Sequence, residues 1–453
     1  MVVIRRNIYD LKKEVSANNI NCDLYIKNIR DYGAAVDIGT TTISLSLFSL
    51  DNKKHLANIT ETNLQTKYGT DVMMRIMHAN MGKAFMLHEI VTKQIEDMLD
   101  KASSGICEAK AIKKLTVTGN TTMCHLFLDK DLSQMTGVPF ITAYKGSIST
   151  CGKDIGFKKY SHLSIYVMSG VTAHIGADAV SMLCAKKLYA PDKIQLAIDI
   201  GTNAEILLNN KGEIYACSAA AGPAFEGGGT KCGKRAGNGV VNGVKISKFT
   251  GNIVLNVIDT EGLQQNEMPL KGICGSGLVD AVAELLKIGV LNQDGHLMEY
   301  SEALENKVHK DIAERLKKDS EGSFFVLCDN IFITQKDIRS IQLAKAAVQA
   351  GAEILLKKAD ICMDDVDEIK IAGVFGKFIH PKSAKAFGLY PDACKDKIEF
   401  VGNAAGSGAA MALLDDNFKK LTEKYAKIIK HIELADEDEF KNKFFSAMAL
   451  KKW

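Results

Sequence analysis

The sequence predicts an α/β protein built from two copies of one unit, because one short phrase occurs twice between strand-like segments. The first copy is AVDIGTTTISLSLF at residues 35–48, and the second is AIDIGTNAEILL at residues 197–208. They lie about one domain length, roughly 150 residues, apart. A single copy is typical of any β-hairpin, whereas two copies in register indicate a duplicated hairpin.

In both copies an apolar run carries an aspartate, turns at a glycine and resumes as a second apolar run. This pattern predicts a strand, a tight polar turn and a returning strand. Gly39 and Gly201 let the backbone approach a bound group, and the N–H groups of such turns donate to phosphate oxygens. Asp37 and Asp199 suit a hydrated Mg²⁺ that keeps most of its waters. We therefore predict that the two hairpins face each other across one phosphate chain.

Length and composition limit the classes of protein. A chain of 453 residues is long enough for two or three domains, and 46% apolar with 25% charged residues is typical of a globular protein. The net charge of +3 is too small to imply nucleic acid or a membrane as an obligatory partner. We find neither an apolar run of membrane-spanning length nor a signal peptide in the sequence, so a cytoplasmic location is expected.

Eleven cysteines in such a chain favour a reducing compartment over a disulfide framework. No two of them have the C-x₂-C or C-x₄-C spacing of a ferredoxin or a zinc knuckle. Buried free thiols are the main expectation. A cluster held by scattered ligands such as Cys217, Cys232 and Cys274, or shared between subunits, stays open.

Three other segments carry polar groups at turns. LTVTGNTTMCHLFL at 115–128 predicts a strand, a turn and a helix; Asn120 in the turn is either catalytic or part of an ordinary connection. The glycine-dense segment 222–229 predicts a loop that approaches a ligand, with a flexible surface loop as the alternative. Gly275 and Ser276 precede an amphipathic helix, whose N-terminus would bind an anion.

The remaining segments give coarser predictions. Helical spacing indicates a helix over much of 60–105 and a strongly amphipathic one over 336–358, whereas residues 139–157 are expected to form a loop. His174 and Asp178 stand one helical turn apart. They could form an acid–base pair near the cleft, but a capping or structural hydrogen bond is the main expectation.

The motif order resembles that of the actin, hexokinase and heat-shock chaperone superfamily of ATPases. VDIGTTT and IDIGTNAEI are similar to its two phosphate motifs, IKIAGVFGKFI to its adenosine motif, and SGVTAHIGADAV and VGNAAGSGAA to its two connecting helices. The resemblance covers roughly residues 33–415. It implies two ribonuclease-H-like lobes of the actin-like ATPase fold around a central nucleotide cleft that binds Mg-ATP.

The resemblance also implies roles for residues. Asp37 and Asp199 would hold Mg²⁺ through water and position the attacking water, with Asn120 as a third candidate catalytic residue. The implied nucleotide-binding residues are Gly39, Thr40, Thr41, Thr42, Gly201, Thr202, Asn203, Gly275, Ser276, Gly373, Gly376, Gly402 and Asn403. The implied domains are a lead-in at 1–32, a first lobe at 33–190, a second lobe at 191–415 and a C-terminal tail at 416–453.

Within that superfamily, GNTTMCHLFL, ACSAAAGPAFEGG, GICGSGLVD and GNAAGSGAAMALL are similar to the ATP-dependent reductive activators of corrinoid proteins. That family returns Co(II) to Co(I) in corrinoid proteins of methyltransferase systems and typically adds an iron–sulfur domain. Here only Cys22 precedes the first hairpin, and no cluster motif is seen. The resemblance therefore implies a corrinoid protein partner and a separate low-potential electron donor, with a homodimer left open. The implied partner or coupling loop comprises Gly222, Pro223, Phe225, Glu226 and Gly227.

Two other functions fit the same motifs. A metabolite kinase of this fold would transfer the γ-phosphate to a hydroxyl or carboxylate, with Asp199 as the general base. A nucleotide-binding regulatory scaffold would bind ATP with negligible turnover, although two intact hairpins argue against it.

Overall fold

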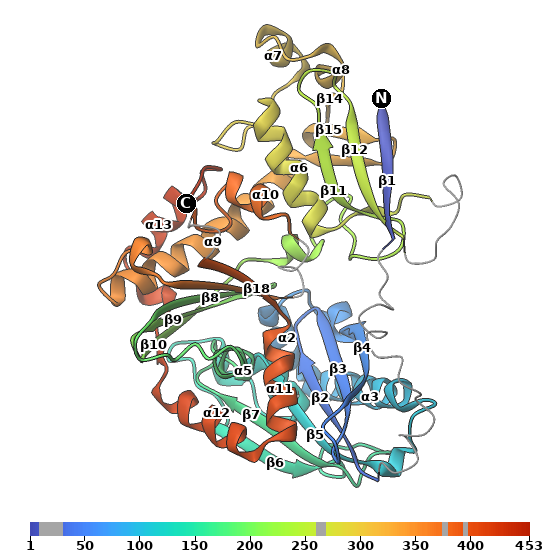
Figure 1. Cartoon of the computed structure of the whole chain (residues 1–453), viewed down its shortest axis with the longest axis vertical. Helices are drawn as coiled ribbons and strands as arrows, with labels where there is room; N and C mark the ends of the chain where they lie inside the picture. Colours follow the sequence, from blue (N-terminus) through green and yellow to red (C-terminus); the bar gives the residue numbers. More distant parts are fainter. Residues whose placement is uncertain (9–29, 260–268, 374–378, 393–396) are drawn as a thin grey trace.

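The computed structural model describes residues 1–8, 30–259, 269–373, 379–392 and 397–453 (Figure 1). These residues form two six-stranded sheets, one four-stranded sheet and one three-stranded sheet, with helices packed on them. The predicted α/β class is confirmed. Gly376, one of the predicted nucleotide-binding residues, lies outside the described residues.

The two six-stranded sheets repeat one topology. The first contains β2 (Tyr32–Ile38), β3 (Thr42–Ser49), β4 (His55–Thr62), β5 (Ile112–Gly119), β6 (Gly146–Cys151) and β7 (Ser164–Gly170). The second contains β8 (Ile194–Ile200), β9 (Ala204–Asn210), β10 (Glu213–Ala219), β17 (Glu368–Ala372), β18 (Ile398–Gly402) and β19 (Lys430–His431). The order β4-β3-β2-β5-β7 in the first matches β10-β9-β8-β17-β18 in the second. The predicted duplication is therefore visible as two sheets of the same strand order.

The repeated phrase forms an equivalent hairpin in each sheet. β2 pairs with β3, and β8 with β9, both antiparallel. The turns are closed by Gly39 N–H donating to the Thr42 carbonyl at 2.9 Å and Gly201 N–H donating to the Asn203 carbonyl at 3.2 Å. A Cβ on Gly39 would lie 2.6 Å from the Thr42 oxygen, so the first turn has no room for a side chain.

The parallel strand beside each hairpin also ends in a glycine. β5 pairs with β2 and β17 with β8. A Cβ on Gly119 would lie 2.6 Å from the Ile38 carbonyl oxygen, and one on Gly373 would lie 2.6 Å from the Ile200 carbonyl oxygen. Both glycines have positive φ, +157° and +95°. They let the chain turn directly over the ends of the two aspartate-bearing strands.

The second six-stranded sheet is buried on both faces because successive side chains of a strand point to opposite sides. Leu196 and Ile198 of β8 join the core that contains α9 (Gln335–Lys358), whereas Ala197 between them joins the core of the first sheet. One sheet therefore links the two cores. The predicted amphipathic helix at 336–358 is confirmed as α9.

Two helices rich in small residues pack together beside the first sheet. They are α5 (Ala177–Ala185) and α11 (Ala404–Leu414), which come from the two predicted lobes. A Cβ on Gly408 would lie 2.6 Å from the Ser181 carbonyl oxygen, so glycine is required for this approach. The contact matches the meeting of two connecting helices that the resemblance implies.

Two expectations are wrong in part. The helix expected over 60–105 begins late, because residues 55–62 form edge strand β4 beside β3, and Gly82 at φ +85° interrupts the helix that follows. The loop expected over 139–157 contains β6, which pairs with β7. Both strands lie at sheet edges, where half-exposed side chains weaken the alternation of apolar residues. The helices in and after these segments are α2 (Val72–His78), α3 (Ala84–Ser103) and α4 (Thr121–Phe127).

The upper body in Figure 1 carries the two smaller sheets. Residues 2–8 pair with residues 253–259 in parallel, so the first strand of the chain adds to a sheet formed much later. The four-stranded sheet has the order β1-β12-β11-β13 and the three-stranded one β14-β15-β16. Their bounds are β1 (Val2–Ile8), β11 (Val240–Ile246), β12 (Ile253–Asp259), β13 (Gly272–Ile273), β14 (Leu316–Asp319), β15 (Gly322–Cys328) and β16 (Ile331–Thr334). The helices here are α6 (Gly275–Ile288), α7 (Tyr300–Glu305), α8 (Lys310–Ala313) and α10 (Pro381–Ala386).

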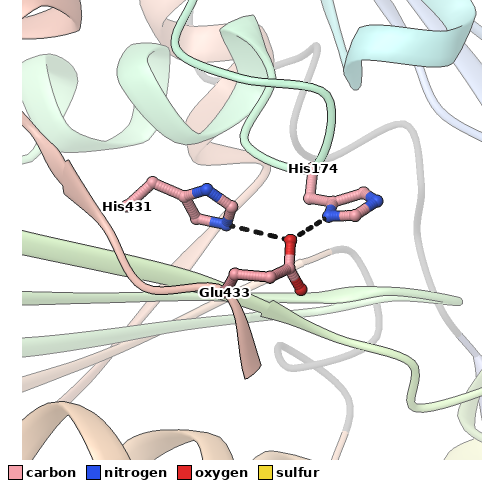
Figure 2. A group of neighbouring side chains, drawn as sticks. All are labelled: His174, His431 and Glu433. Carbon is pink, nitrogen blue, oxygen red and sulfur yellow. Dashed lines mark hydrogen bonds and ion pairs between the residues drawn. The ribbon is translucent and has the colours of Figure 1, made fainter. Parts of the chain in front are cut away.

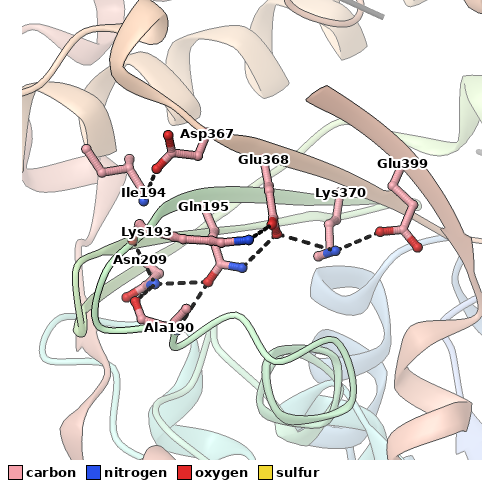
Figure 3. A network of polar contacts seen from close by, with 9 residues as sticks. All are labelled: Ala190, Lys193, Ile194, Gln195, Asn209, Asp367, Glu368, Lys370 and Glu399. Atoms are coloured by element: carbon pink, nitrogen blue, oxygen red, sulfur yellow. Dashed lines mark hydrogen bonds and ion pairs between the residues drawn. The ribbon is translucent and has the colours of Figure 1, made fainter. Parts of the chain in front are cut away.

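Polar contacts align β8, β9, β17 and β18 near the start of β8 (Figure 3). Glu368 binds Lys193 and accepts a hydrogen bond from the Gln195 amide at 2.9 Å. Lys370 lies 3.7 Å from Glu368 and 2.7 Å from Glu399. These contacts join three strands laterally and support the parallel register of β8, β17 and β18.

The C-terminal residues pack on elements of both predicted lobes. α12 (Asp416–Ile428) contacts α5 and β7, whereas α13 (Phe440–Ala447) contacts α9. The last helix of the chain is thus packed against α9 of the predicted second lobe. None of the described helices is both long and apolar enough to span a bilayer.

Candidate functional site

The two hairpin turns open into one shared cavity of about 460 Å³. Both aspartates that end the central strands, Asp37 and Asp199, line it. The predicted juxtaposition of the two carboxylates is confirmed. The other predicted site residues that line the cavity are Gly39, Thr40, Thr41, Thr42, Asn120, Gly201, Thr202, Asn203, Phe225, Glu226, Gly275, Ser276, Gly373 and Asn403.

The two turns are hydrogen-bonded to each other. The hydroxyl oxygens of Thr41 and Thr202 lie 2.9 Å apart. Thr202 donates its hydroxyl to the Glu226 carboxylate at 2.9 Å. Because a threonine has one hydroxyl proton, Thr41 is the donor in the bond between the two turns. A chain of three side chains thus connects the first hairpin, the second hairpin and the glycine-dense segment.

Six carboxyl groups line this cavity, and burial together with neighbouring carboxylate charges raises the pKa of three of them, Asp37, Asp199 and Glu205. Burial first, and then the charge of Asp178, raise the pKa of Asp37 to about 7. Burial and the charges of Asp178, Asp37 and Glu226 raise the pKa of Asp199 to about 8. Burial and the nearby Asp178 and Asp199 also raise the pKa of Glu205, which stands directly opposite Asp199 on β9.

This donor set fits a magnesium ion. The cavity offers carboxylate, hydroxyl and backbone oxygens, the ligands that Mg²⁺ prefers. The raised carboxyl pKa values mark a place where positive charge would relieve both repulsion and desolvation. Asp37 and Asp199 have the positions from which they would hold a hydrated ion.

Two arginines brace the first turn. Arg75 of α2 is fully buried and donates to the Thr40 carbonyl, and its Nε donates to the Gly69 carbonyl at 3.1 Å. Arg235 belongs to the predicted second lobe and donates to two groups of the predicted first lobe, the Thr41 carbonyl and, at 2.8 Å, the Thr42 hydroxyl. The two guanidinium groups bind carbonyl oxygens of the turn and thereby fix its backbone conformation.

Asn120 has both ends of its amide engaged. Its Oδ1 accepts from the Met123 N–H at 3.0 Å and caps α4, and its Nδ2 donates to the Thr40 hydroxyl at 2.9 Å. The residue lines the cavity but is tied to the helix and to the first turn. These contacts suit a residue that positions Thr40.

Of the nucleotide-binding residues predicted in and after the adenosine motif, some line the cavity and one does not. Gly373 and Asn403 line the cavity, whereas Gly402 ends β18 at φ +62° and is not among the lining residues. Asn403 caps α11, accepting from the Gly406 N–H at 2.6 Å, and its side chain hydrogen-bonds Asp37. Asn403 thus connects α11 with Asp37, a candidate magnesium ligand.

The start of α6 points into the cavity. Gly275 begins the helix and Cys274 precedes it as the N-cap. Both line the cavity with Ser276, whose hydroxyl donates to the Asn242 carbonyl at 3.0 Å. The free N–H groups and the dipole at this helix terminus favour an anion, as predicted from the Gly-Ser-Gly turn.

The glycine-dense segment is folded against the second hairpin. Its centre is a short 3₁₀ helix, η6 (Pro223–Glu226), and Gly222 N–H donates to the Thr202 carbonyl at 2.8 Å. Phe225 is fully buried, and a Cβ on Gly227 would lie 2.4 Å from the Lys234 carbonyl oxygen. Pro223 and Gly227 are not among the cavity-lining residues. The segment is therefore part of the packed wall of the site.

The geometry bears on two alternatives that the sequence left open. His174 lies in the loop before α5 and bonds Glu433 at 2.6 Å, so its partner is Glu433 and not Asp178, which faces the cavity. The thiols of Cys217, Cys232 and Cys274 contact Gly351, Asn330 and Ser276 respectively. Among the described residues these cysteines do not gather into a metal-binding group.

Sequence reasoning considered Asp178 only as one alternative, in an acid–base pair with His174, and did not assign Glu205 or Arg75 to the site. Asp178 belongs to the first turn of α5, which only the fold brings to the strand ends. Glu205 had a visible signal, since it follows the second DIGT turn on a strand that pairs with the aspartate-bearing one. Arg75 stands within an apolar helical pattern, which gives no indication that its guanidinium reaches the first turn.

Comparison with known proteins agrees with these features. Residues 193–453 match the family described as the C-terminal domain of RACo, the ASKHA domain, and residues 32–191 match the RACo middle region. The corrinoid activation enzyme RamQ of Eubacterium limosum is 32% identical over an alignment of 421 residues that covers 90% of this chain and 68% of that protein. The Co(II) methylated amine-specific corrinoid protein reductase of Methanosarcina barkeri is 25% identical over an alignment of 448 residues that covers 93% of this chain and 77% of that protein.

A solved structure gives the same result. The reductive activator for corrinoid, iron-sulfur protein superimposes with a TM-score of 0.83 at 32% identity, covering 94% of this chain and 67% of that chain. The resemblance to the actin-like ATPase superfamily is confirmed by the ASKHA domain match. The chain belongs to the RACo family of corrinoid reductive activators.

Proposed function

We propose that this protein hydrolyses ATP to drive reduction of a corrinoid protein from the inactive Co(II) form to Co(I). The observation that supports this most is the single cavity lined by both DIGT turns, in a chain whose relatives are named for corrinoid activation and reduction. Each Co(II) that is reduced to Co(I) takes up one electron. In this proposal a separate low-potential donor supplies that electron.

In this proposal the chain contributes mainly positioning and charge. Asp37 and Asp199 hold a hydrated Mg²⁺, which would neutralise charge on the phosphates when bound. The turns at Gly39–Thr42 and Gly201–Asn203 donate N–H and hydroxyl groups to the β- and γ-phosphates. Such alignment and charge stabilisation account for most catalysis of phosphoryl transfer.

The adenosine end of the nucleotide is assigned to the part of the cavity lined by Gly373 and Asn403. Gly373 leaves room over the end of β8, and Asn403 joins this side to Asp37. The start of α6 at Gly275 and Ser276 supplies a further anion contact. Gly376 and Gly402 complete the proposed adenosine side.

Coupling to the partner runs through contacts between the two hairpins. A nucleotide that interacts differently with open and closed arrangements shifts the equilibrium between them. The bond from Thr41 to Thr202, continued to Glu226, connects both hairpins to the segment at 222–227. Phe225 is buried and most of its neighbours in this segment are half-buried, so the segment is proposed as a coupling element, with direct contact to the partner as the alternative.

Three further parts of the proposal rest on sequence alone. They are a cytoplasmic location, a homodimeric assembly, and the division into a lead-in at 1–32, lobes at 33–190 and 191–415, and a tail at 416–453. In the structure, α11 and α12 pack on the first sheet or its helix α5, so the second lobe and the tail both contact the first lobe.

A mixing assay tests the function. The full chain is combined with Mg-ATP, a low-potential reductant and a Co(II) corrinoid protein of a methyltransferase system, and the Co(I) absorbance band is followed. We expect the band to grow only with ATP and to be lost with Asp199→Asn. Turnover of ATP that requires a small hydroxyl or carboxylate acceptor would instead identify a metabolite kinase, and ATP binding without turnover would identify a scaffold.

A further inference from the structure

A second cluster of chemically active side chains lies away from the nucleotide cavity. His174 comes from the loop before α5, and His431 and Glu433 come from the chain at and just after β19 (Figure 2). The Nδ1 atom of His174 lies 2.6 Å from Glu433 Oε2, and the Nε2 atom of His431 lies 4.0 Å from the same oxygen. These three ligand atoms all lie within 4.8 Å of one another.

Each of the three side chains is also held from outside the cluster. The Thr172 hydroxyl lies 3.2 Å from His431 Nδ1, so the other ring nitrogen of His431 is the one directed at Glu433. The ring of Phe140 packs on His174 with centroids 4.6 Å apart. Ala435 N–H approaches the outer Glu433 oxygen at 3.5 Å. Such support of ring and carboxylate orientation is typical of metal ligands.

We propose that His174, His431 and Glu433 bind one divalent transition metal ion of the Zn²⁺ class. The ligand atoms would be Nδ1 of His174, Nε2 of His431 and a carboxylate oxygen of Glu433, with water in the fourth position. Two imidazoles and one carboxylate suit Zn²⁺, Co²⁺ or Ni²⁺, whereas Mg²⁺ prefers oxygen alone. The site is thus chemically distinct from the cavity at Asp37 and Asp199.

The adjustment that the ion requires is small. Ligands at about 2.0–2.1 Å in a tetrahedron lie about 3.4 Å from one another. The His174–Glu433 pair would therefore separate slightly and His431 would approach. The three side chains are half-buried, with exposed fractions of 31%, 14% and 22% for His174, His431 and Glu433.

The ion would fasten the C-terminal segment to the loop that leads into the nucleotide site. His174 stands four residues before Asp178, which lines the cavity, and the Thr172 carbonyl accepts from the Thr121 hydroxyl at 2.6 Å. The inference rests on the geometry of the cluster alone and does not depend on the corrinoid function.

Metal titration of the full chain tests this inference. Chelator-treated protein is titrated with Zn²⁺ by calorimetry and with Co²⁺ by visible absorption, in excess Mg²⁺ so that the carboxylates of the cavity are occupied. The variants are Glu433→Gln and His431→Gln. His296→Gln is the matched control, because His296 forms an exposed pair with Glu302 at 3.1 Å that has no third ligand among the described residues.

We expect one ion per chain, with the visible bands of four-coordinate Co²⁺ and no thiolate charge-transfer band. Loss of a ligand should weaken binding by more than the roughly 10–100-fold that loss of a supporting hydrogen bond costs, and His296→Gln should bind normally. No binding to the wild-type chain, or equal binding to Glu433→Gln, would overturn the proposal. If a variant unfolds, the wild-type stoichiometry and Co²⁺ spectrum still decide.

Discussion

The hydroxyl of Thr41 donates to the hydroxyl of Thr202 across 2.9 Å, and the two residues stand 161 positions apart in the chain. Thr41 belongs to the first hairpin turn and Thr202, the counterpart of Thr40, belongs to the second. The bond therefore joins the two halves of the duplicated fold at the point where both face the cavity.

Removing the Thr202 hydroxyl should weaken nucleotide binding more than removing that of Thr41. Thr202→Val breaks the bonds to Thr41 and to Glu226 and leaves a carboxylate unpaired, whereas Thr41→Val breaks only one bond. We expect the dissociation constant of a non-hydrolysable ATP analogue to rise about tenfold for Thr202→Val, or about 1.4 kcal/mol. An equal or larger effect of Thr41→Val would contradict this order.

Neutralising Asp199 should stabilise the nucleotide-free and magnesium-free protein at high pH. The folded pKa of about 8 is above the ordinary 3.8, so the stability associated with the protonated carboxyl is present below pH 4 and is lost as the pH rises to 8. Asn stays neutral throughout. Asp199→Asn should therefore raise the free energy of unfolding by about 2 kcal/mol at pH 8, since water in the cavity reduces the full effect.

The stability difference should shrink toward pH 4, where the wild-type carboxyl is protonated as well. Denaturant titrations at pH 4.5, 6 and 8 measure it, with the exposed Asp192→Asn as the control. A constant difference across the three pH values would show that Asp199 is not the titrating group.

Replacing Arg235 should affect nucleotide binding without unfolding the protein. Its guanidinium donates to the Thr41 carbonyl, the Thr42 hydroxyl and, at 2.5 Å, the Thr62 hydroxyl, all in the predicted first lobe. Arg235→Lys keeps the charge but cannot make these bonds together. We expect about tenfold weaker ATP affinity and an unchanged melting temperature, whereas Lys234→Gln at the exposed neighbouring position should change neither. Unchanged affinity in Arg235→Lys would contradict a role in holding the first turn.

The polar network on β8, β17 and β18 should contribute to stability alone. Glu368→Gln loses the ion pairs to Lys193 and Lys370, which are partly exposed, so we expect a loss of about 1 kcal/mol or less. Nucleotide affinity should not change, because the network lies away from the cavity. Glu399→Gln, at the exposed edge of the same network, should cost less. Thermal unfolding and analogue binding on the same samples separate the two effects.

The repeated phrase predicted the most important part of the site. An aspartate at the end of an apolar strand, followed by glycine, defines a position in the sheet, and duplication places two such positions opposite each other. Asp178 could not be predicted in this way, because it comes from the first turn of a helix and reaches the cavity only through the packing of α5 against α11. Its signal depends on the fold and not on its neighbours in sequence.

Edge strands were the weakest part of the fold prediction. Residues 146–151 carry few large apolar side chains, and their pairing with β7 supplies the order that the local sequence does not indicate. The pairing of residues 2–8 with residues 253–259 is equally hidden, since nothing in either segment identifies a partner so far along the chain.

The central claim is that two hairpin turns bind one magnesium nucleotide together, and calorimetric titration with a non-hydrolysable Mg-ATP analogue tests it most directly. We predict one nucleotide per chain, and binding at least about 100-fold weaker in both Asp37→Asn and Asp199→Asn, because each removes one of the two carboxylates proposed to hold the ion. Two nucleotides per chain, or full affinity in either variant, would contradict the claim.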